Sequence, residues 1–219
     1  MLPRSLQIAQ RAIVLVEGAD EYYLIPELIR VRGLPQVQLI AYGGTSANLT
    51  TVLKAVVKLP HFNDLVTSLG VIKDADTNRD GAAQAVRSSL LAAGLKAPQD
   101  DLTIHNGPPR VAYLIAPKLG ATGALEECLL ESVAGHPALD CIDTLLGCVE
   151  QRTQKTIAMR NKAKVRALLA VRPEEPLNLV SEGAKAGLFP VVHEAFNDLA
   201  RLIDLVGQAP PDFGTGAND

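Results

Sequence analysis

Two short acidic clusters carry the residue types and the spacing that metal-ion chemistry requires. The first is Glu17-Gly18-Ala19-Asp20-Glu21, which follows an apolar run at residues 12–16, and the second is Asp74-Ala75-Asp76, which follows residues 69–72. Carboxylates crowded at one place repel one another and raise their own pKa values, unless a divalent cation neutralises them. Because hard cations take oxygen ligands, the simplest interpretation is a site for Mg²⁺ or Mn²⁺.

The apolar runs between the polar segments predict the elements that position these clusters. Continuous rather than alternating apolar residues predict buried parallel strands at residues 12–16, 37–42, 67–73 and 111–116. Helical spacing predicts helices at 21–32, 46–57, 82–93 and 125–133. Connections of this length suit parallel crossovers, so we expect an α/β sheet. Ligands collect at the carboxyl ends of such strands, where both clusters lie.

The strand signals end after Pro137. Residues 138–169 and 191–206 each predict helix, on either side of a loop that contains Pro173 and Pro176. The sequence therefore predicts an α/β domain at residues 1–135 and a helical extension at 136–207 packed on it. A tail at 208–219, where Pro, Gly and Asp are frequent, is expected to be disordered.

Composition limits the partners of the chain. The 219 residues have a net charge of −3, so a role with nucleic acid would need a local basic patch rather than a basic surface overall. Trp is absent and aromatic residues make up only 4%, which disfavours a platform for base stacking. A hydrophobic content of 47% suits one compact domain with an appended helical part.

The three cysteines and the N-terminal residues point to the cytoplasm. Cys128, Cys141 and Cys148 form no Cys-x-x-Cys pair, which is typical of reduced thiols in a cytosolic protein. No signal-peptide pattern opens the sequence, and no apolar stretch approaches the roughly 20 residues that span a bilayer. We therefore expect a cytoplasmic protein with no membrane partner.

Five short motifs follow one another along the chain. They are Glu17-Gly18-Ala19-Asp20-Glu21, Gly43-Gly44, Asp74-Ala75-Asp76-Thr77-Asn78, Gly123-Ala124-Leu125-Glu126 and Lys162-Ala163-Lys164-Val165. In this order they resemble the Toprim domain, and most closely an uncharacterised bacterial and archaeal Toprim-like family related to the overcoming-lysogenization-defect (OLD) nucleases. The resemblance runs from about residue 13 to about residue 170, most of the chain.

The resemblance implies a Toprim-like parallel sheet of about four strands flanked by helices, with a C-terminal helical extension. It also implies Mg²⁺- or Mn²⁺-dependent cleavage of a nucleic-acid phosphodiester. Asp74 and Asp76 would hold the metal, and Glu17 would either share it or act as general acid/base. Glu21 and Glu126 would hold a second ion, about 3.5–4 Å from the first. Lys162 would neutralise charge developing on the phosphate.

The chain also departs from the larger Toprim enzymes. No Gly-x-x-x-x-Gly-Lys-Ser/Thr sequence is present, so no P-loop ATPase accompanies the motifs. Tyr22 and Tyr23 lie inside the first predicted helix and are poor candidates for a nucleophile that links to DNA. A metal role for Glu126 stays open. For Asp20 and Glu127 the favoured interpretation is a solvated carboxylate at the start of a helix.

A basic run on a predicted helix is the candidate contact for nucleic acid. It consists of Arg160, Lys162, Lys164 and Arg166. Such a run is usually a solvated helix face. A near-neutral protein that binds nucleic acid must, however, concentrate its positive charge somewhere, so we expect this run to face the acidic site.

The Asp74 to Asp76 segment has two rival interpretations. Asp76-x-Asn78-x-Asp80-Gly81 matches the start of an EF-hand loop, but position twelve is Arg87 rather than Glu, and a strand precedes it. A haloacid-dehalogenase-type phosphotransferase would use Asp74 as nucleophile and Asp76 as acid/base. That strand is usually the first of its fold, whereas here Glu17 precedes it.

Three functions follow as hypotheses. The favoured one is a metal-dependent nuclease acting on DNA or RNA. The second is a catalytically weak regulatory module that binds nucleic acid or a partner protein, with a homodimer also open. The third is a phosphotransferase acting on a small molecule.

Overall fold

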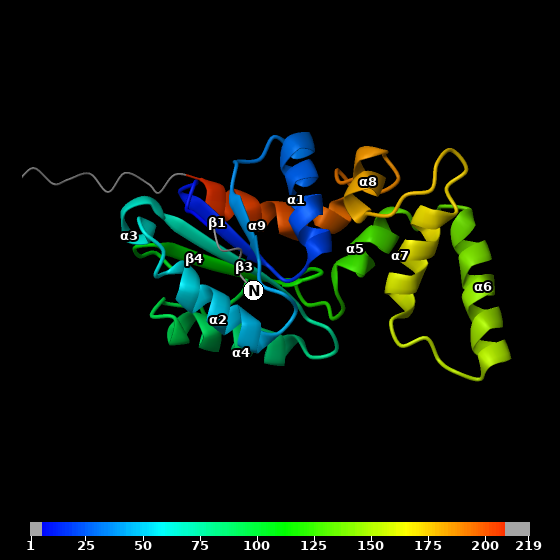
Figure 1. Ribbon diagram of the computed structural model, residues 1–219, viewed down its shortest axis with the longest axis horizontal. Helices are drawn as coiled ribbons and strands as arrows, with labels where there is room; N and C mark the ends of the chain where they lie inside the picture. Colours follow the sequence, from blue (N-terminus) through cyan, green and yellow to red (C-terminus); the bar gives the residue numbers. More distant parts are fainter. Residues whose placement is uncertain (1–5, 209–219) are drawn as a thin grey trace, which may run out of the picture.

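A four-stranded parallel sheet forms the centre of the computed structural model, which describes residues 6–208 (Figure 1). The strand order is β2-β1-β3-β4. The strands are β1 (Ala12–Val16), β2 (Gln38–Ala41), β3 (Ser68–Asp74) and β4 (Arg110–Ala116). The predicted α/β fold class is confirmed, and each predicted strand agrees within one residue at either end.

Helices cover both faces of the sheet, which explains why its strands are largely apolar. α2 (Ser46–Val56) and α4 (Arg79–Ala92) pack on one face, where Ile13 and Leu15 of β1 lie among their buried residues. α1 (Ala19–Arg32) and α9 (Asn197–Gly207) pack on the other, with Val14 and Val16. Figure 1 shows the sheet between these two helix layers.

The connections leave β1 and β3 toward opposite faces of the sheet. After β1 the chain enters α1, whereas after β3 it enters α4 on the other face. Neighbouring parallel strands whose helices diverge in this way open a crevice between their carboxyl ends. Glu17 directly follows β1 and Asp74 ends β3, so both acidic clusters lie at this crevice.

A helical hairpin replaces the single helix predicted at residues 138–169. α6 (Ala138–Thr153) and α7 (Arg160–Ala170) lie side by side beyond α5 (Leu125–Ser132), at the far end of the molecule from α3 (Phe62–Leu65) (Figure 1). Gln154 ends α6 in the left-handed conformation, with φ of 53°. Glu150 then closes the turn, accepting the Ile157 N–H at 2.9 Å and pairing with Arg160 at 2.6 Å.

The last helix also begins later than predicted. The predicted helix at 191–206 is instead a 3-10 turn, η1 (Glu194–Phe196), followed by α9, because His193 caps the turn with its Nδ1 accepting the Ala195 N–H at 3.1 Å. The short helix α8 (Val180–Lys185) precedes this segment and packs against α1.

α9 returns from the helical extension to the sheet, where it packs on β4, β3 and β1. At Gly70 of β3 a Cβ atom would lie 3.0 Å from Val206 Cγ2, so the close approach of α9 favours glycine there. The core thus includes residues from both sides of the domain boundary predicted at 135, and the boundary itself stays a prediction. Of the tail predicted to be disordered, residues 209–219 lie outside the described residues. None of the helices described is long and apolar enough to cross a membrane.

Candidate active site

One cavity at the carboxyl ends of β1 and β3 gathers all five carboxylates predicted to bind metal. It has a volume of about 560 Å³ and we call it the acidic cavity. The five side chains come from four separate segments: the end of β1, the first turn of α1, the end of β3 with the second residue after it, and α5. They are Glu17, Glu21, Asp74, Asp76 and Glu126. Their common location agrees with the expectation drawn from the strand ends.

Glu17 is held in place by three hydrogen-bond donors. Its Oε2 accepts from the Asp74 backbone N–H at 3.0 Å, the Tyr42 hydroxyl at 3.1 Å and the Lys73 Nζ at 3.1 Å. Burial, then the charge of Glu17, raises the pKa of Tyr42, which therefore stays protonated as a donor. Lys73 is an almost fully buried cation on β3, with a side chain 9% exposed. Glu17 is consequently fixed by contacts to two neighbouring strands.

Asp74 carries a buried oxygen that nothing in the described part of the chain satisfies. Its Oδ1 is shielded from solvent and has no hydrogen-bond partner there. Burial first, and then the nearby carboxylates of Glu21 and Glu17, raise the pKa of Asp74 to about 8. Leaving a buried acceptor unpaired costs about 1–3 kcal/mol. An oxygen maintained at that cost beside other carboxylates is a natural ligand for a cation.

Asp76 is held to the loop that follows β4. Its backbone N–H donates to the Gly123 carbonyl at 2.8 Å, and the Gly123 N–H donates back at 2.7 Å. Asp76 adopts φ of 48°, an uncommon conformation for a residue other than glycine. Gly123 has φ of 115°, and a Cβ there would lie 2.6 Å from the Glu127 carboxyl carbon. This pairing draws the start of α5, and with it Glu126, to the acidic cavity.

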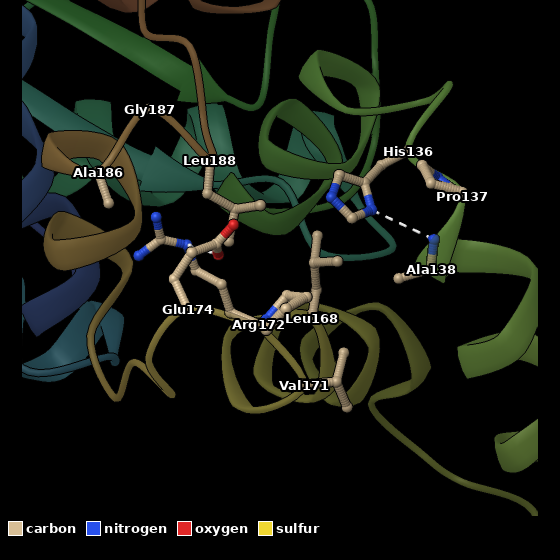
Figure 2. A pocket seen from close by; sticks show the side chains of 11 residues that line it. His136, Pro137, Ala138, Leu168, Val171, Arg172, Glu174, Ala186, Gly187 and Leu188 are labelled. Carbon is tan, nitrogen blue, oxygen red and sulfur yellow. Dashed lines mark hydrogen bonds and ion pairs between the residues drawn. The ribbon is translucent and has the colours of Figure 1, made fainter.

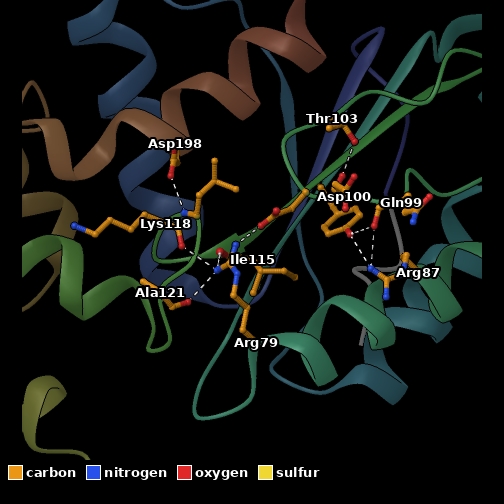
Figure 3. A network of polar contacts seen from close by, with 12 residues as sticks. Arg79, Arg87, Gln99, Asp100, Thr103, Ile115, Lys118, Ala121 and Asp198 are labelled. Atoms are coloured by element: carbon orange, nitrogen blue, oxygen red, sulfur yellow. Dashed lines mark hydrogen bonds and ion pairs between the residues drawn. The ribbon is translucent and has the colours of Figure 1, made fainter.

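Arg79 anchors the same loop from α4 (Figure 3). Its Nη1 donates to three backbone carbonyls, those of Ile115 at 2.8 Å, Lys118 at 2.9 Å and Ala121 at 2.9 Å. Its Nη2 pairs with Asp101. The segment after Asp76 and the loop that carries Gly123 are therefore tied together twice, once by backbone and once by a half-buried guanidinium.

Glu21 and Glu126 each have a partner inside the cavity. Glu21 is buried and its Oε2 accepts the Gly18 N–H at 3.0 Å, while burial, outweighing these hydrogen bonds, raises its pKa. Glu126 Oε1 lies 3.0 Å from Lys162 Nζ. Burial lowers the pKa of Lys162, but the hydrogen bond and charge of Glu126 outweigh it and the net shift is upward. Both carboxylates are thus occupied by donors of this chain.

The four residues of the basic run on α7 lie in three different environments. Lys162 and Arg166 border the acidic cavity, and Arg166 also pairs with Asp20 at 2.9 Å. Arg160 borders a neighbouring cavity of about 350 Å³, which Asp76 and Glu126 also line. Lys164 binds Asp143 of α6 at 2.7 Å. The run was expected to face the acidic site, and the structure places Lys162 and Arg166 there and Lys164 against α6.

The side chains of the acidic cavity are of the type that a hard cation binds, but they are not grouped around a single point. All five carboxylates offer oxygen, and Asp74 Oδ1 is buried and has no hydrogen-bond partner among the described residues. Over residues 6–208, however, no three His, Cys, Asp or Glu side chains form a group that could hold a metal ion. Within these residues, Glu17, Glu21 and Glu126 each contact a donor of the chain. The metal ligands therefore stay a prediction.

Sequence reasoning missed three residues of this site. Lys73 and Tyr42 bind Glu17, and Arg79 binds the loop after β4. Lys73 had a signal, since a lysine directly before Asp74 interrupts an otherwise apolar strand. Tyr42 and Arg79 had none, because their partners are fixed only by the order of the strands and by the path of the loop.

A further cavity of about 500 Å³, apart from the acidic cavity, lies between α7, α8 and the loop before α6 (Figure 2). His136 borders it and its Nδ1 accepts the Ala138 N–H at 3.2 Å. Arg172 and Glu174, which also border it, pair with each other at 3.1 Å. With those charges mutually neutralised, this cavity lacks the accumulated charge that distinguishes the acidic cavity.

Comparisons with known proteins place the chain in a family. It is similar to the solved structure of the C-terminal region of the Burkholderia pseudomallei OLD protein, with 17% identity and a TM-score of 0.37 over 91% of this chain and 90% of that one. No curated protein matches it. The model of the family described as a protein of unknown function, DUF3226, matches residues 11–203, which include the whole sheet, the acidic cavity and α7. The chain therefore belongs to the DUF3226 family.

Proposed function

We propose that the acidic cavity is the active site of a metal-dependent phosphodiesterase that cleaves nucleic acid. The convergence of five carboxylates at the crevice between β1 and β3 supports this most strongly. Burial first, and then the neighbouring carboxylates, raise the pKa of Asp74, so an ionised Asp74 is costly in this place. A protein tolerates such a cost at a site whose ligand relieves it, and a divalent cation does so.

Asp74 and Asp76 would hold a first Mg²⁺ or Mn²⁺, with Glu17 beside them, and Glu21 and Glu126 would hold a second. Bound metal ions supply Lewis-acid activation of the phosphate and acidify a bound water. Glu126 Oε1 is paired with Lys162. If Glu126 exchanged this partner for a metal ion, Lys162 would become available to a phosphate oxygen. The Glu126–Lys162 pair, at 3.0 Å, thus links the occupation of the site to the binding of substrate.

The contacts of Glu17 support a positioning role for this residue rather than proton transfer. Three donors already occupy its Oε2, so that oxygen has little capacity to accept a proton from water or from a hydroxyl. Its Oε1 remains for the cavity. Lys73 offsets part of the negative charge beneath the site, which lowers the repulsion that a polyanionic substrate meets.

The cationic side chains at the cavity agree with a nucleic-acid substrate. Lys162 and Arg166 border the acidic cavity and Arg160 borders the cavity next to it. A flank of cationic side chains, each paired with a carboxylate of the chain, therefore lies along one side of the site. A phosphodiester backbone requires such a flank, because phosphate contacts provide most of the sequence-independent affinity.

A catalytically weak regulatory module is the second candidate. One observation favours it: within the described residues the carboxylates are paired with donors of the chain rather than grouped around a single point. The small-molecule phosphotransferase has less support, because the nucleophile it requires, Asp74, has one carboxylate oxygen shielded from solvent. The EF-hand has less still, since β3 precedes the motif and Asn78 caps α4.

Cleavage assays on labelled oligonucleotides test the proposal. Single-stranded and duplex DNA and RNA are incubated with Mn²⁺, Mg²⁺ or EDTA. We expect cleavage with metal only, and a loss on the order of 100-fold or more in Asp76→Asn. Asp80→Asn is the matched control, since Asp80 is also exposed and lies four residues further on in the first turn of α4. Equal rates in the two variants, or no cleavage of any substrate by the wild type, would favour the regulatory module.

A further inference from the structure

A separate pocket adjoins the acidic cavity and shares a wall with it. Its volume is about 420 Å³, and Glu17, Gly18, Ala19 and Gly43 border both hollows. The rest of its lining is mostly apolar or aromatic and comes from α1 and from β2. We call it the tyrosine pocket, after Tyr22 and Tyr23.

The two tyrosines are presented to solvent rather than used in the core. Their rings are 5.1 Å apart between centroids and perpendicular, at 86°, and the residues are 36% and 52% exposed. The core-facing side of α1 is supplied by other residues, among them Leu24, Ile25 and Leu28. Tyr42 and Tyr113, the other two tyrosines, are buried. An exposed aromatic pair at the wall of an active-site cavity offers a ring face to a ligand.

We propose that the tyrosine pocket binds an unpaired nucleobase, and therefore that the substrate is single-stranded nucleic acid. This inference rests on the proposed function, because the acidic cavity must hold the phosphodiester. The base attached to that phosphodiester then has to lie next to it, across the wall formed by residues 17–19. The only aromatic surface beside that wall, within the residues described, is the Tyr22–Tyr23 pair.

The chemistry of a nucleobase matches this lining. A base has apolar faces and polar edges, and stacking on an aromatic side chain contributes about 1–3 kcal/mol for any of the bases. Leu39 and Ile40 provide an apolar surface, and the Gly18 and Gly43 backbone lies at the shared wall. Bases within a duplex are stacked on their neighbours and paired, so they cannot enter a side pocket without being flipped out.

Fluorescence anisotropy with labelled oligonucleotides tests the inference. The probes are a single-stranded 12-mer, a blunt-ended duplex of two complementary strands, and an abasic backbone of the same length, each measured with Ca²⁺. The ring is removed in the double variant Tyr22→Leu/Tyr23→Leu and kept in Tyr22→Phe/Tyr23→Phe. Leu91→Ala, at a residue 64% exposed on α4, is the control for loss of an exposed apolar side chain. Thermal unfolding confirms that each variant is folded.

We expect the leucine variant to bind the single strand about 5- to 150-fold more weakly, which corresponds to the loss of one stacked base. The phenylalanine variant and the Leu91→Ala control should bind it like the wild type. Affinity for the blunt-ended duplex and for the abasic backbone should not change in any variant, because neither offers an unpaired base to the pocket.

Two results would overturn the inference: an equal loss on all three probes, or a phenylalanine variant as weak as the leucine variant. Absence of any binding by the wild type would overturn it as well. The outcomes separate from those of the proposed function. If the Tyr22→Leu/Tyr23→Leu variant cleaves as well as the wild type, the proposed nuclease stands and the proposed base pocket falls. If binding depends on the bases but the protein neither cleaves nor binds metal, the base pocket stands and the protein is better described as a regulatory module.

Discussion

Lys73 Nζ lies 3.1 Å from Glu17 Oε2, and the two side chains are only 9% and 13% exposed. The pair joins the carboxyl ends of β3 and β1 directly beneath the acidic cavity. It gives one of the five carboxylates a permanent counter-charge supplied by the fold. Glu126 has a counter-charge of its own in Lys162. Within residues 6–208, Glu21, Asp74 and Asp76 are therefore the carboxylates of the cavity that have no cationic partner.

Breaking this pair should destabilise the protein strongly. Removal of one partner of a buried ion pair leaves an uncompensated charge, at a cost of about 3–5 kcal/mol. We expect this loss in the free energy of unfolding for Lys73→Met, measured by urea denaturation. The double variant Lys73→Met/Glu17→Gln should lose clearly less stability than the sum of the losses in Lys73→Met and Glu17→Gln, because neither an unpaired lysine nor an unpaired carboxylate remains buried. Additive losses would mean that the two side chains do not depend on each other.

The metal-free protein should lose stability as the pH rises, because of Asp74. In the unfolded chain this carboxyl ionises near its usual pKa of 3.8, whereas in the fold burial and the neighbouring carboxylates hold its pKa at about 8. Between these values the unfolded state binds fewer protons than the folded state, so the free energy of unfolding falls with increasing pH. The stability present below pH 3.8 is thus lost as the pH passes through this window.

Urea denaturation in EDTA at several values between pH 5 and pH 8 measures this dependence. Asp74→Asn, which cannot ionise, should show a shallower decline, and its advantage over the wild type should widen up to about pH 8. Parallel curves for the two proteins would show that the pKa of Asp74 is not raised by folding.

Arg79 should act on the metal site through the loop after β4. Its substitution by Ala frees the carbonyls of Ile115, Lys118 and Ala121, which loosens the loop that holds Asp76 and presents Glu126. Supporting residues of this kind typically change metal affinity by 10- to 100-fold. We expect a loss of this size for Mn²⁺ in Arg79→Ala by isothermal titration calorimetry.

Arg87→Ala is the control for Arg79. Arg87 is on the same helix and also bridges to neighbouring structure, donating to the Gln99 carbonyl at 3.0 Å and lying 3.1 Å from the Tyr113 hydroxyl (Figure 3). Both variants should unfold at lower temperature, but Arg87→Ala should keep the Mn²⁺ affinity of the wild type. Equal affinities in the two variants would reduce Arg79 to a purely structural residue.

Lys162 and Lys164 should differ in their effect on nucleic-acid binding, although they are two residues apart. Lys162 borders the acidic cavity, whereas Lys164 binds Asp143 of α6. We expect Lys162→Ala to weaken binding and to flatten the dependence of log K on log salt by roughly 0.7–0.9, the slope of one phosphate contact. Lys164→Ala should leave that slope unchanged. A salt series followed by anisotropy decides between this division and a basic run that acts as a whole.

The strands and the acidic edge of the sheet were predictable because each depends on local sequence. A strand buried on both faces is largely apolar, and β1 is apolar throughout, so its bounds are visible in the sequence. Glu17 and Asp74 each follow such a run, and parallel strands end at a common edge. That β1 and β3 are neighbours, and that their helices leave toward opposite faces, could not be deduced from one sequence.

The remaining features depend on contacts between distant residues. The turn between α6 and α7 was missed because residues 138–169 keep a helical pattern, and the turn is closed by the polar contacts of Glu150 with Ile157 and Arg160. The pairing of Glu126 with Lys162 was missed for a similar reason, since α5 and α7 meet only in the folded protein. Both residues had been assigned to the site, but as separate contacts to metal and phosphate.

Anomalous diffraction from crystals soaked in Mn²⁺ is the most direct measurement of the proposed metal centre. We expect a strong anomalous peak in the acidic cavity, bordered by Asp74 and Asp76, with Glu126 released from Lys162. The same soak of Asp74→Asn/Asp76→Asn crystals should give no peak there. An empty cavity in the wild type at saturating Mn²⁺, or a peak that survives in the double variant, would contradict the assignment of these carboxylates to a metal ion.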